Sequence, residues 1–290
     1  MDFLSVVWNV DPIICRIGPL ALRYYSILFV LGFPIGYWLF IKFYRREKVD
    51  TDLLEPLLYA LLIGTIVGAR LGHCFFYQPD YYLTKAHWLE IFQPWKGGLA
   101  SHGGAIGVLL AVWWYSAKYG KKNNFDMMWV LDRLVIAVCF AGCLIRLGNL
   151  FNSEIYGNET TLPWGFIFQR RGEVVPKHPT QIYEALSYLI LGFILLWVYW
   201  RKSDKVFRGW LFGAFFIGCF GMRFLIEFIK LPQVDFEVGM KLNMGQLLSI
   251  PFIIAGIISI IWSYRARKPL LREDKPTHYC PPPKSARQAA

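Results

Sequence analysis

Arginine side chains that interrupt long apolar stretches are the residues of this sequence best suited to chemistry. Arg70, Arg146 and Arg223 lie within or at the edge of runs in which most neighbours are apolar. An arginine at the centre of a membrane helix costs about 2.5–3.5 kcal/mol on insertion scales, so it is rarely accidental. A guanidinium group binds phosphate in a bidentate manner and keeps its charge when desolvated. These arginines predict a site for an anion such as a phospholipid headgroup, with snorkelling or structural pairing as the alternative.

The densest polar stretch is residues 145–157, at the end of an expected helix. Its polar and turn-forming residues are Arg146, Asn149, Asn152, Glu154 and Gly157. Arg146 and Asn149 are three residues apart, so they share one face of a helix. The simpler interpretation is a polar helix end whose carbonyl groups are capped, and both interpretations remain open at this point.

Two further stretches carry polar residues next to apolar runs. Ser101 and His102 stand between two glycine pairs, and the spacing of Gly103 and Gly107 is typical of close helix packing in membranes. Packing does not explain His102, which could accept a proton near neutral pH, although a lone histidine is more often structural. The other stretch is residues 178–184, where a proline precedes an expected helix.

Composition indicates a membrane protein. Of the 290 residues 56% are hydrophobic and only 18% are charged, against roughly 25% charged in soluble domains. This apolar content excludes a disordered chain, and it argues against a nucleic-acid partner despite the net charge of +11. Seven stretches approach the roughly 20 apolar residues that a membrane crossing needs, namely 19–41, 54–77, 103–119, 126–147, 185–200, 209–229 and 245–264.

Loop charges predict the orientation of these spans. Most loop cations follow the first, third, fifth and seventh spans, and Lys and Arg are retained in the cytoplasm, so the N-terminus is expected outside and the C-terminus inside. Lys230 counts among the cations of the outer loops. Six spans then bring polar groups to the outer half of the bilayer: Tyr25, Arg70, His102, Arg146, Asn149, Arg223, Glu227 and Gln246. Arg223 and Glu227 are four residues apart, so they could also simply pair.

The outer segment between about 150 and 183 is expected to contain a small β-hairpin. Phe166–Gln169 and Glu173–Val175 flank the turn at 170–172. The sequence has no Gly-rich phosphate loop, no His-Glu-x-x-His motif and no Gly-x-Ser-x-Gly motif. Its six cysteines include no Cys-x-x-Cys pair. We therefore expect no metal site and no cofactor.

The run from Arg146 to Gly157 closely resembles the signature of bacterial prolipoprotein diacylglyceryl transferases. The resemblance extends in order and spacing over roughly residues 10–265. It includes Leu-Arg-Tyr-Tyr ending at Tyr25, Gly-Ala-Arg-Leu-Gly around Arg70, Ser-His-Gly-Gly at His102, His-Pro-Thr-Gln-Ile-Tyr-Glu from 178, Arg223 with Glu227, and Met-Gly-Gln ending at Gln246.

This resemblance implies an all-α enzyme of about seven spans in the bacterial inner membrane, with its active site toward the outer face. Residues 1–265 would form one catalytic domain, and 266–290 a flexible cytoplasmic tail. The substrates would be phosphatidylglycerol and the lipobox cysteine in a prolipoprotein signal peptide. Arg146 and Arg223 match the essential arginines of the family. Positions that the family needs also include Tyr25, His102, Asn149, Glu154 and Gly157.

Two residues depart from the family pattern. Ile145 replaces the glycine before the signature arginine, and His73 replaces an aromatic residue. His102 is the candidate base, and His73 leaves that choice open.

As a mechanism, the substrate thiol would attack the glyceryl carbon that carries the phosphodiester oxygen, and Arg146 and Arg223 would stabilise the leaving phosphate. Glu154 and Glu227 would orient these arginines. Substrate-binding roles are expected for Tyr25, Arg70, Asn149, Asn152, Glu154, Gly157, Glu227 and Gln246. The alternative function is an anion or lipid transporter, but we see no internal repeat of the kind that transporters carry.

Overall fold

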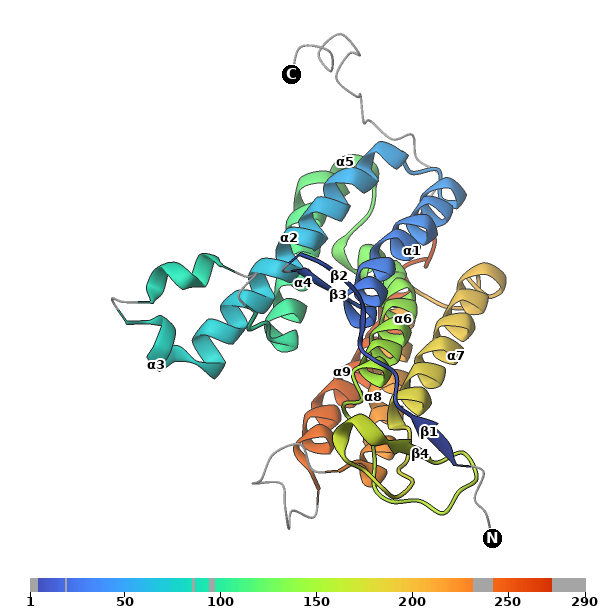
Figure 1. Cartoon of the computed structure of the whole chain (residues 1–290). Coiled ribbons are helices and arrows are strands. Elements are labelled where there is room, and N and C mark those ends of the chain that lie inside the picture. The colour runs from blue at the N-terminus through green and yellow to red at the C-terminus, as the bar shows by residue number, and fades with distance from the viewer. Residues whose placement is uncertain (1–4, 19, 85–86, 94–96, 232–241, 273–290) are drawn as a thin grey trace. The chain divides into compact units, whose positions relative to one another are not determined.

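The computed structural model describes residues 5–18, 20–84, 87–93, 97–231 and 242–272 (Figure 1). Six of its helical segments are long and apolar enough to cross a membrane: Tyr24–Arg46, Thr51–Tyr77, Met127–Phe151, Thr180–Arg201, Trp210–Ile229 and Met244–Ala266. Large apolar side chains remain exposed along these helices, for example Val30 at 60% and Ile63 at 62%. The predicted fold class, a helical protein with several membrane spans, is confirmed.

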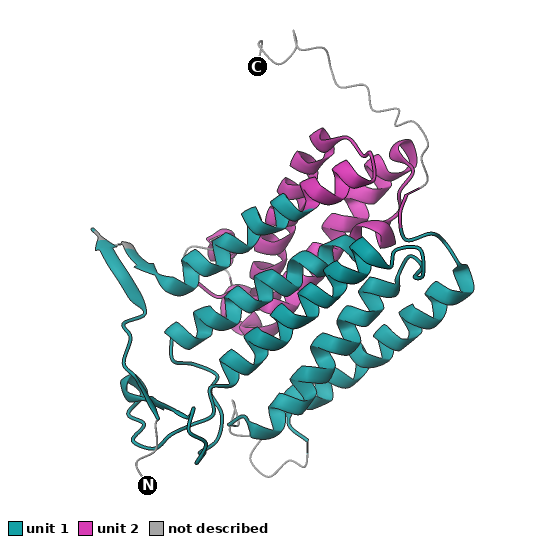
Figure 2. Ribbon diagram, turned by 90° about the vertical axis from the view of Figure 1, so that its right-hand side faces the viewer, with its two compact units in different colours: residues 1–39, 132–270 teal, residues 40–131, 271–290 magenta. Residues whose placement is uncertain are grey.

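The chain divides into two compact units, coloured separately in Figure 2. Unit 1 comprises residues 1–39 and 132–270, and unit 2 comprises residues 40–131 and 271–290. The division passes through two helices, α1 (Tyr24–Arg46) and α6 (Met127–Phe151). Each unit is described by itself.

The helices of unit 1 run side by side in Figure 2. Besides its parts of α1 and α6, this unit contains α7 (Thr180–Arg201), α8 (Trp210–Ile226), a 3-10 turn at Glu227–Ile229 and α9 (Met244–Ala266). Small residues let these helices approach closely. A Cβ atom added to Gly213 in α8 would lie 2.6 Å from the carbonyl oxygen of Gly256 in α9. Such contacts replace the hydrophobic driving force, which is weak between helices in lipid.

Among the described residues, three short strands precede the first helix, and a fourth lies in the outer segment. β2 (Ile13–Ile17) pairs antiparallel with β3 (Leu20–Arg23), so the first span begins at Tyr24 and not at residue 19. β1 (Val6–Trp8) pairs in parallel with β4 (Phe166–Phe168). A strand therefore forms at 166–168, but the expected hairpin partner at 173–175 does not. A 3-10 turn at Gln169–Arg171 and a left-handed Gly172, at φ 76°, lead the chain away. Phe166 in β4 instead forms an antiparallel bridge with Lys177, further along the chain than the expected partner.

A buried charge in α6 fixes the start of α8. Asp132 is fully buried, and its carboxylate accepts hydrogen bonds from the backbone N–H groups of Gly209, at 2.7 Å, and Phe212, at 2.9 Å. These N–H groups have no partner within the helix, so Asp132 caps α8 from a neighbouring helix. Asp132 therefore has a structural role at the start of α8.

Unit 2 is built around the crossing of α2 (Leu54–Gly72) and α4 (Ser101–Tyr115). The two helices touch through glycines. A Cβ atom added to Gly107 would lie only 1.9 Å from the carbonyl oxygen of Gly64, and one added to Gly68 would lie 2.4 Å from that of Gly103. The small-residue spacing expected from the sequence thus produces a contact between backbones.

The remaining elements of unit 2 are short. α2 follows a 3-10 turn at Thr51–Leu53 and continues into a π turn at His73–Tyr77. It is followed by α3 (Pro79–Tyr82) and a 3-10 helix at Trp88–Phe92. α4 has 15 residues and continues through a π turn at Ser116–Gly120 into α5 (Lys121–Asn123). The predicted third span is thus helical, but α4 alone is shorter than the roughly 20 residues that a crossing needs.

The first residues of the predicted flexible tail are packed. In unit 2 the Arg272 guanidinium donates hydrogen bonds to the carbonyl oxygens of Glu47, Lys48 and Asn123. In unit 1 Leu270 is fully buried, and its carbonyl oxygen accepts a bond from Arg133 at 2.8 Å. The tail expected from residue 266 is therefore anchored up to Arg272, and its remainder, 273–290, lies outside the described residues.

Candidate active site

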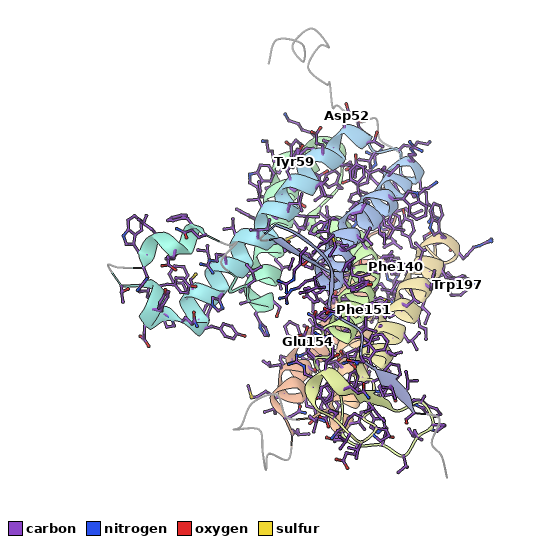
Figure 3. All side chains as sticks on the ribbon, viewed as in Figure 1. Asp52, Tyr59, Phe140, Phe151, Glu154 and Trp197 are labelled. Carbon is purple, nitrogen blue, oxygen red and sulfur yellow. The ribbon has the colours of Figure 1, made fainter. Side chains whose placement is uncertain are left out.

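The signature stretch forms a hydrogen-bonded network at the C-terminal end of α6. The Nδ2 group of Asn149 donates to Glu154 Oε1 at 2.7 Å, and that of Asn152 donates to the same oxygen at 3.2 Å. Arg146 donates to Asn149 Oδ1 at 3.4 Å. Glu154 and Phe151 are labelled at this end of α6 in Figure 3. The structure thus brings four of the predicted residues together, and Glu154 orients Arg146 only through Asn149.

The backbone around Glu154 is held in an unusual shape. Ser153, at φ 52°, and Ile155, at φ 62°, are both left-handed, and such a conformation is a genuine outlier for a β-branched residue. It costs of order 1–3 kcal/mol per residue, so the surroundings must enforce it. Two buried side chains of α7 do so. Gln181 donates to the carbonyl oxygen of Glu154, and Thr180 donates to that of Ile155, both at 2.7 Å.

Four buried charges of alternating sign connect α6, α7 and the end of α8. Arg146 Nε lies 2.7 Å from Glu184 Oε2, and Lys230 Nζ lies 2.7 Å from Glu184 Oε1 and 3.2 Å from Glu227 Oε2. The exposed fraction of these side chains is 15% for Arg146, 5% for Glu227, and 1% for Glu184 and Lys230. Removing one member of a buried pair costs about 3–5 kcal/mol, because the other charge is left uncompensated.

These pairings show the partners of two residues named in the sequence. Glu227 does not pair with Arg223, although the two are four residues apart, and among the described residues it pairs with Lys230 instead. Lys230, counted among the outer-loop cations, is buried and paired with two carboxylates, and the side of the membrane on which it lies stays a prediction. Helical spacing makes an ion pair possible, but a buried lysine from the following turn competes better for Glu227.

Arg223 is an arginine of unit 1 that has neither an ion pair nor a hydrogen bond to another residue in the described part of the chain. Its Nε atom is buried and has no hydrogen-bond partner. A buried donor without an acceptor is costly, so such an atom suggests a missing ligand. Arg223 is therefore suited to bind an anion, and it differs from Arg146 in having no carboxylate partner among the described residues.

Tyr25 packs against the same end of α6. A Cβ atom added to Gly148 would lie 2.8 Å from the Tyr25 ring, so this glycine makes room for the ring next to Asn149. The Tyr25 hydroxyl interacts electrostatically with both Glu154 and Arg146. The structure thus brings Tyr25 into the group predicted from the sequence.

Three predicted substrate-binding residues have packing roles in the structure, and their contact with substrate stays a prediction. A Cβ atom added to Gly157 would lie 2.4 Å from the carbonyl oxygen of Ile229, so Gly157 allows two backbones to meet. Gln246 is 2% exposed and forms a capping box with Asn243 at the start of α9. The carboxylate of Glu227 sits against Gly245, where a Cβ atom would lie 2.4 Å from its Cδ. The Met-Gly-Gln motif therefore supports Glu227 and the helix start.

Arg70 lies in unit 2, where main-chain oxygens accept hydrogen bonds from its guanidinium, and its substrate-binding role stays a prediction. The side chain is 3% exposed. It donates four hydrogen bonds to main-chain carbonyl oxygens, those of Glu90, Ile91, Gly97 and Gly98. It also lies 4.9 Å from the centroid of the Tyr82 ring. Its donors hold the segment between α2 and α4 in place, and sequence alone could not reveal those carbonyl partners.

The two candidate bases also lie in unit 2. His102 is exposed in the first turn of α4 and has no hydrogen-bond partner among the described residues. His73 Nε2 lies 3.3 Å from Gln78 Oε1, and a Cβ atom at the left-handed Gly98 would fall 2.5 Å from its ring. His102 is therefore the more accessible of the two for a substrate proton.

Two groups of the outer segment have perturbed pKa values. Burial, reinforced by a hydrogen bond of 2.8 Å to Glu173, raises the pKa of Tyr156 to about 12. Burial lowers the pKa of His178 below its ordinary value. Across the described ranges, no group of three or more His, Cys, Asp or Glu side chains is arranged to hold a metal ion.

Comparison with known proteins identifies the family. Residues 12–262 match the protein family described as prolipoprotein diacylglyceryl transferase. The chain belongs to this family. A member of this family thus carries the network of Arg146, Asn149 and Glu154 described above.

Relatives named phosphatidylglycerol–prolipoprotein diacylglyceryl transferase occur in several bacteria. The protein of Tolumonas auensis is 46% identical over 260 residues, which cover 90% of this chain and 98% of the relative. That of Chloroherpeton thalassium is 44% identical, covering 91% and 97%. That of Porphyromonas gingivalis is 46% identical, covering 88% and 94%. These names do not favour the transporter alternative.

Four buried residues that support the site were not predicted from the sequence. They are Thr180, Gln181, Glu184 and Lys230. A signal was present, because three of them belong to the polar stretch 178–184 at the start of an apolar run. Their targets are mostly backbone atoms and charges on other helices, which a single sequence does not identify.

Proposed function

We propose that this protein transfers the diacylglyceryl group of phosphatidylglycerol to the cysteine thiol of a prolipoprotein and releases glycerol phosphate. This would be the first step of lipoprotein maturation. The observation that carries the proposal is the family match over residues 12–262. Relatives at 44–46% identity that bear the name of this transferase support it.

The reaction exchanges one bond for another. The sulfur of the substrate thiolate attacks the glyceryl carbon that carries the phosphodiester oxygen. A C–S bond forms, the C–O bond breaks, and its electron pair leaves with the phosphate. The thiol proton passes to a base. No metal or nucleotide is needed to balance this step.

We assign Arg223 and Arg146 to the phosphate. The buried, unpartnered Nε of Arg223 supports this role, since a phosphate oxygen would satisfy it. Fixed donors that meet charge as it develops commonly contribute several kcal/mol to catalysis. Asn149 and Tyr25, next to Arg146, are suited to hydrogen-bond the glycerol or phosphate oxygens. His102, exposed at the start of α4, is the proposed base.

We further propose that the protein lies in the bacterial cytoplasmic membrane, with its N-terminus and active site toward the outer face. The excess of Lys and Arg in the loops after the odd-numbered predicted spans supports this orientation. The peptide partner would be a signal peptide with a lipobox cysteine. Labelling of single cysteines by a membrane-impermeant reagent in intact cells tests the orientation. A cysteine placed next to Gly172 should react, and one placed at Lys202 should not.

A defined assay tests the function. Purified protein is incubated with phosphatidylglycerol and a lipobox peptide, and mass spectrometry should detect a diacylglyceryl adduct on the cysteine. Arg223→Ala and Arg146→Ala should lose most activity. Arg201→Ala, which removes an exposed arginine at the end of α7, should retain it. Wild-type protein that forms no adduct would refute the proposed function, and fully active Arg223→Ala protein would refute the assignment to phosphate.

A further inference from the structure

Glu184 stands between two cations in the interior of unit 1. Its Oε2 lies 2.7 Å from Arg146 Nε, and its Oε1 lies 2.7 Å from Lys230 Nζ. The side chain is 1% exposed, so water contributes little to its stabilisation. Oε2 accepts no hydrogen bond from the described residues, so its contact with Arg146 is that of an ion pair. Glu184 thus orients the guanidinium chiefly through charge.

Glu184 does not neutralise the charge of Arg146 completely, because a second cation shares its carboxylate. Glu184 is shared with Lys230, which is itself shared with Glu227 at 3.2 Å. Arg146, Glu184, Lys230 and Glu227 thus form a row of ion pairs with alternating sign. Arg146 is the cation at one end of this row. Arg146 also contacts Tyr188 of α7 through a side-chain hydrogen bond, and its 3.4 Å contact to Asn149 Oδ1 leads to Glu154 in the signature loop. Arg146 is therefore held from α7 by the charge of Glu184 and the hydroxyl of Tyr188, and from its own helix by the amide of Asn149.

We propose that Glu184 is a positioning residue of the transfer reaction, which fixes the Arg146 guanidinium for the phosphate while Lys230 acts as its counter-ion. The inference rests on the proposed function. Preorganised charge is effective because it needs no rearrangement when the transition state forms. A loosely held arginine would first have to find its orientation, and small displacements of a reacting group lower rates strongly.

A merely structural ion pair between α6 and α7 would have different consequences. It would lower stability and the fraction of active protein, but it would not change how the remaining folded protein binds phosphate. A residue that acts through Arg146 should weaken phosphate binding, and it should lose its influence once Arg146 is absent. Product inhibition by glycerol phosphate measures the first property, since it does not depend on the active fraction. A double-mutant cycle measures the second.

The experiment compares full-length wild type with Glu184→Gln, Arg146→Met and the double variant in the peptide-adduct assay. Glutamine keeps the size of the side chain and removes its charge. We expect Glu184→Gln to weaken inhibition by glycerol phosphate about tenfold and to lower kcat about 10–100-fold. The double variant should be no less active than Arg146→Met alone. It should also melt at a higher temperature than either single variant, because it leaves Lys230 and Glu227 as a neutral pair.

Lys177→Met supplies the matched control. Lys177 is also buried between two carboxylates, at 3.2 Å from Glu159 and 3.3 Å from Glu173, but it lies in the outer segment and does not contact Arg146. Its replacement should lower the melting temperature and leave inhibition by glycerol phosphate unchanged.

Unchanged inhibition in Glu184→Gln, or multiplicative loss of activity in the double variant, would overturn the positioning role while the function stands. Wild type that makes no adduct would refute the function itself, and this inference with it.

Discussion

Replacing Gly103 by alanine tests the backbone contact that sets the start of α4. The added Cβ would lie 2.3 Å from the carbonyl oxygen of Gly68 and 2.7 Å from the Cα of Gly72. Since non-bonded heavy atoms pack best at about 3.5–4 Å, α2 and α4 must separate by roughly 1 Å. Backbone atoms form both sides of this contact, so no side chain can turn aside to absorb the strain.

The magnitude follows from the geometry. A gap of about 1 Å forfeits up to about half of the dispersion energy at a contact, and overpacking typically costs about 1–3 kcal/mol. A crossing made of several glycines belongs at the upper end of that range. The higher helix propensity of alanine over glycine offsets about 1 kcal/mol of this loss in the free energy of unfolding. The net loss is about 2 kcal/mol, equivalent to a fall of roughly 4–8 °C in melting temperature for a chain of this size.

Activity should fall further than stability, because His102 directly precedes Gly103. A displacement of about 1 Å at a reacting group can lower the rate about a hundredfold. Thermal unfolding in detergent and the adduct assay measure the two effects. Gly104→Ala is the control, since a Cβ there would meet its nearest neighbour, Ala69 Cβ, at 3.6 Å. It should be neutral or slightly stabilising. Equal melting temperatures and rates for the two variants would refute the reasoning.

Three further predictions concern the described residues of unit 1. Arg223→Ala should lower kcat/KM about 10²–10³-fold with little change in melting temperature, because Arg223 has no ion pair to lose. Gly245→Ala should cost about 1–3 kcal/mol, because its Cβ would fall 2.4 Å from the Glu227 carboxyl carbon, whereas Gly221→Ala has open space and should cost nothing. Because the pKa of His178 is lowered in the folded protein, the unfolded chain binds a proton at a higher pH than the folded chain does. The contribution of His178 to the free energy of unfolding is therefore complete above about pH 6.5, and it is lost as the pH falls through the folded pKa. Titration of thermal stability should show this slope, and His178→Asn should flatten it.

Each of these has a result that would contradict it. A large fall in the melting temperature of Arg223→Ala would mean that Arg223 holds the fold together. Equal stability of Gly245→Ala and Gly221→Ala would mean that the Glu227 carboxylate can move away from Gly245 without loss of stability. A pH slope that survives in His178→Asn would place the responsible group elsewhere.

The membrane character and the main helices could be predicted from the sequence, because both depend on local patterns. Length and apolar content predict a span wherever about 20 residues avoid charge, and the six long helical segments lie at predicted spans. The predictions differ from the structure where strands pair, since apolar patterns do not specify strand partners. Residues 20–23 pair with the neighbouring β2, and β4 pairs with β1 and bridges to Lys177 rather than to 173–175.

The candidate site was predicted only in part, for a similar reason. The polar residues of 145–157 are close in sequence, so their shared helix end already placed Arg146, Asn149 and Glu154 together. The partners of the arginines come from elsewhere in the chain. Arg70 binds carbonyl oxygens 20–28 residues away, and no residue type marks a carbonyl as an acceptor.

The sequence by itself determined that this chain is a membrane protein and which family it resembles, since composition and motif order need no three-dimensional information. Only the tertiary structure decided which charges are paired. Arg70, Arg146 and Arg223 are equivalent in sequence as arginines of apolar spans. Folding gives the first a set of carbonyl oxygens, the second Glu184, and the third no partner among the described residues. In a medium that solvates charge poorly, that difference in partners separates a structural arginine from one that is ready to bind an anion.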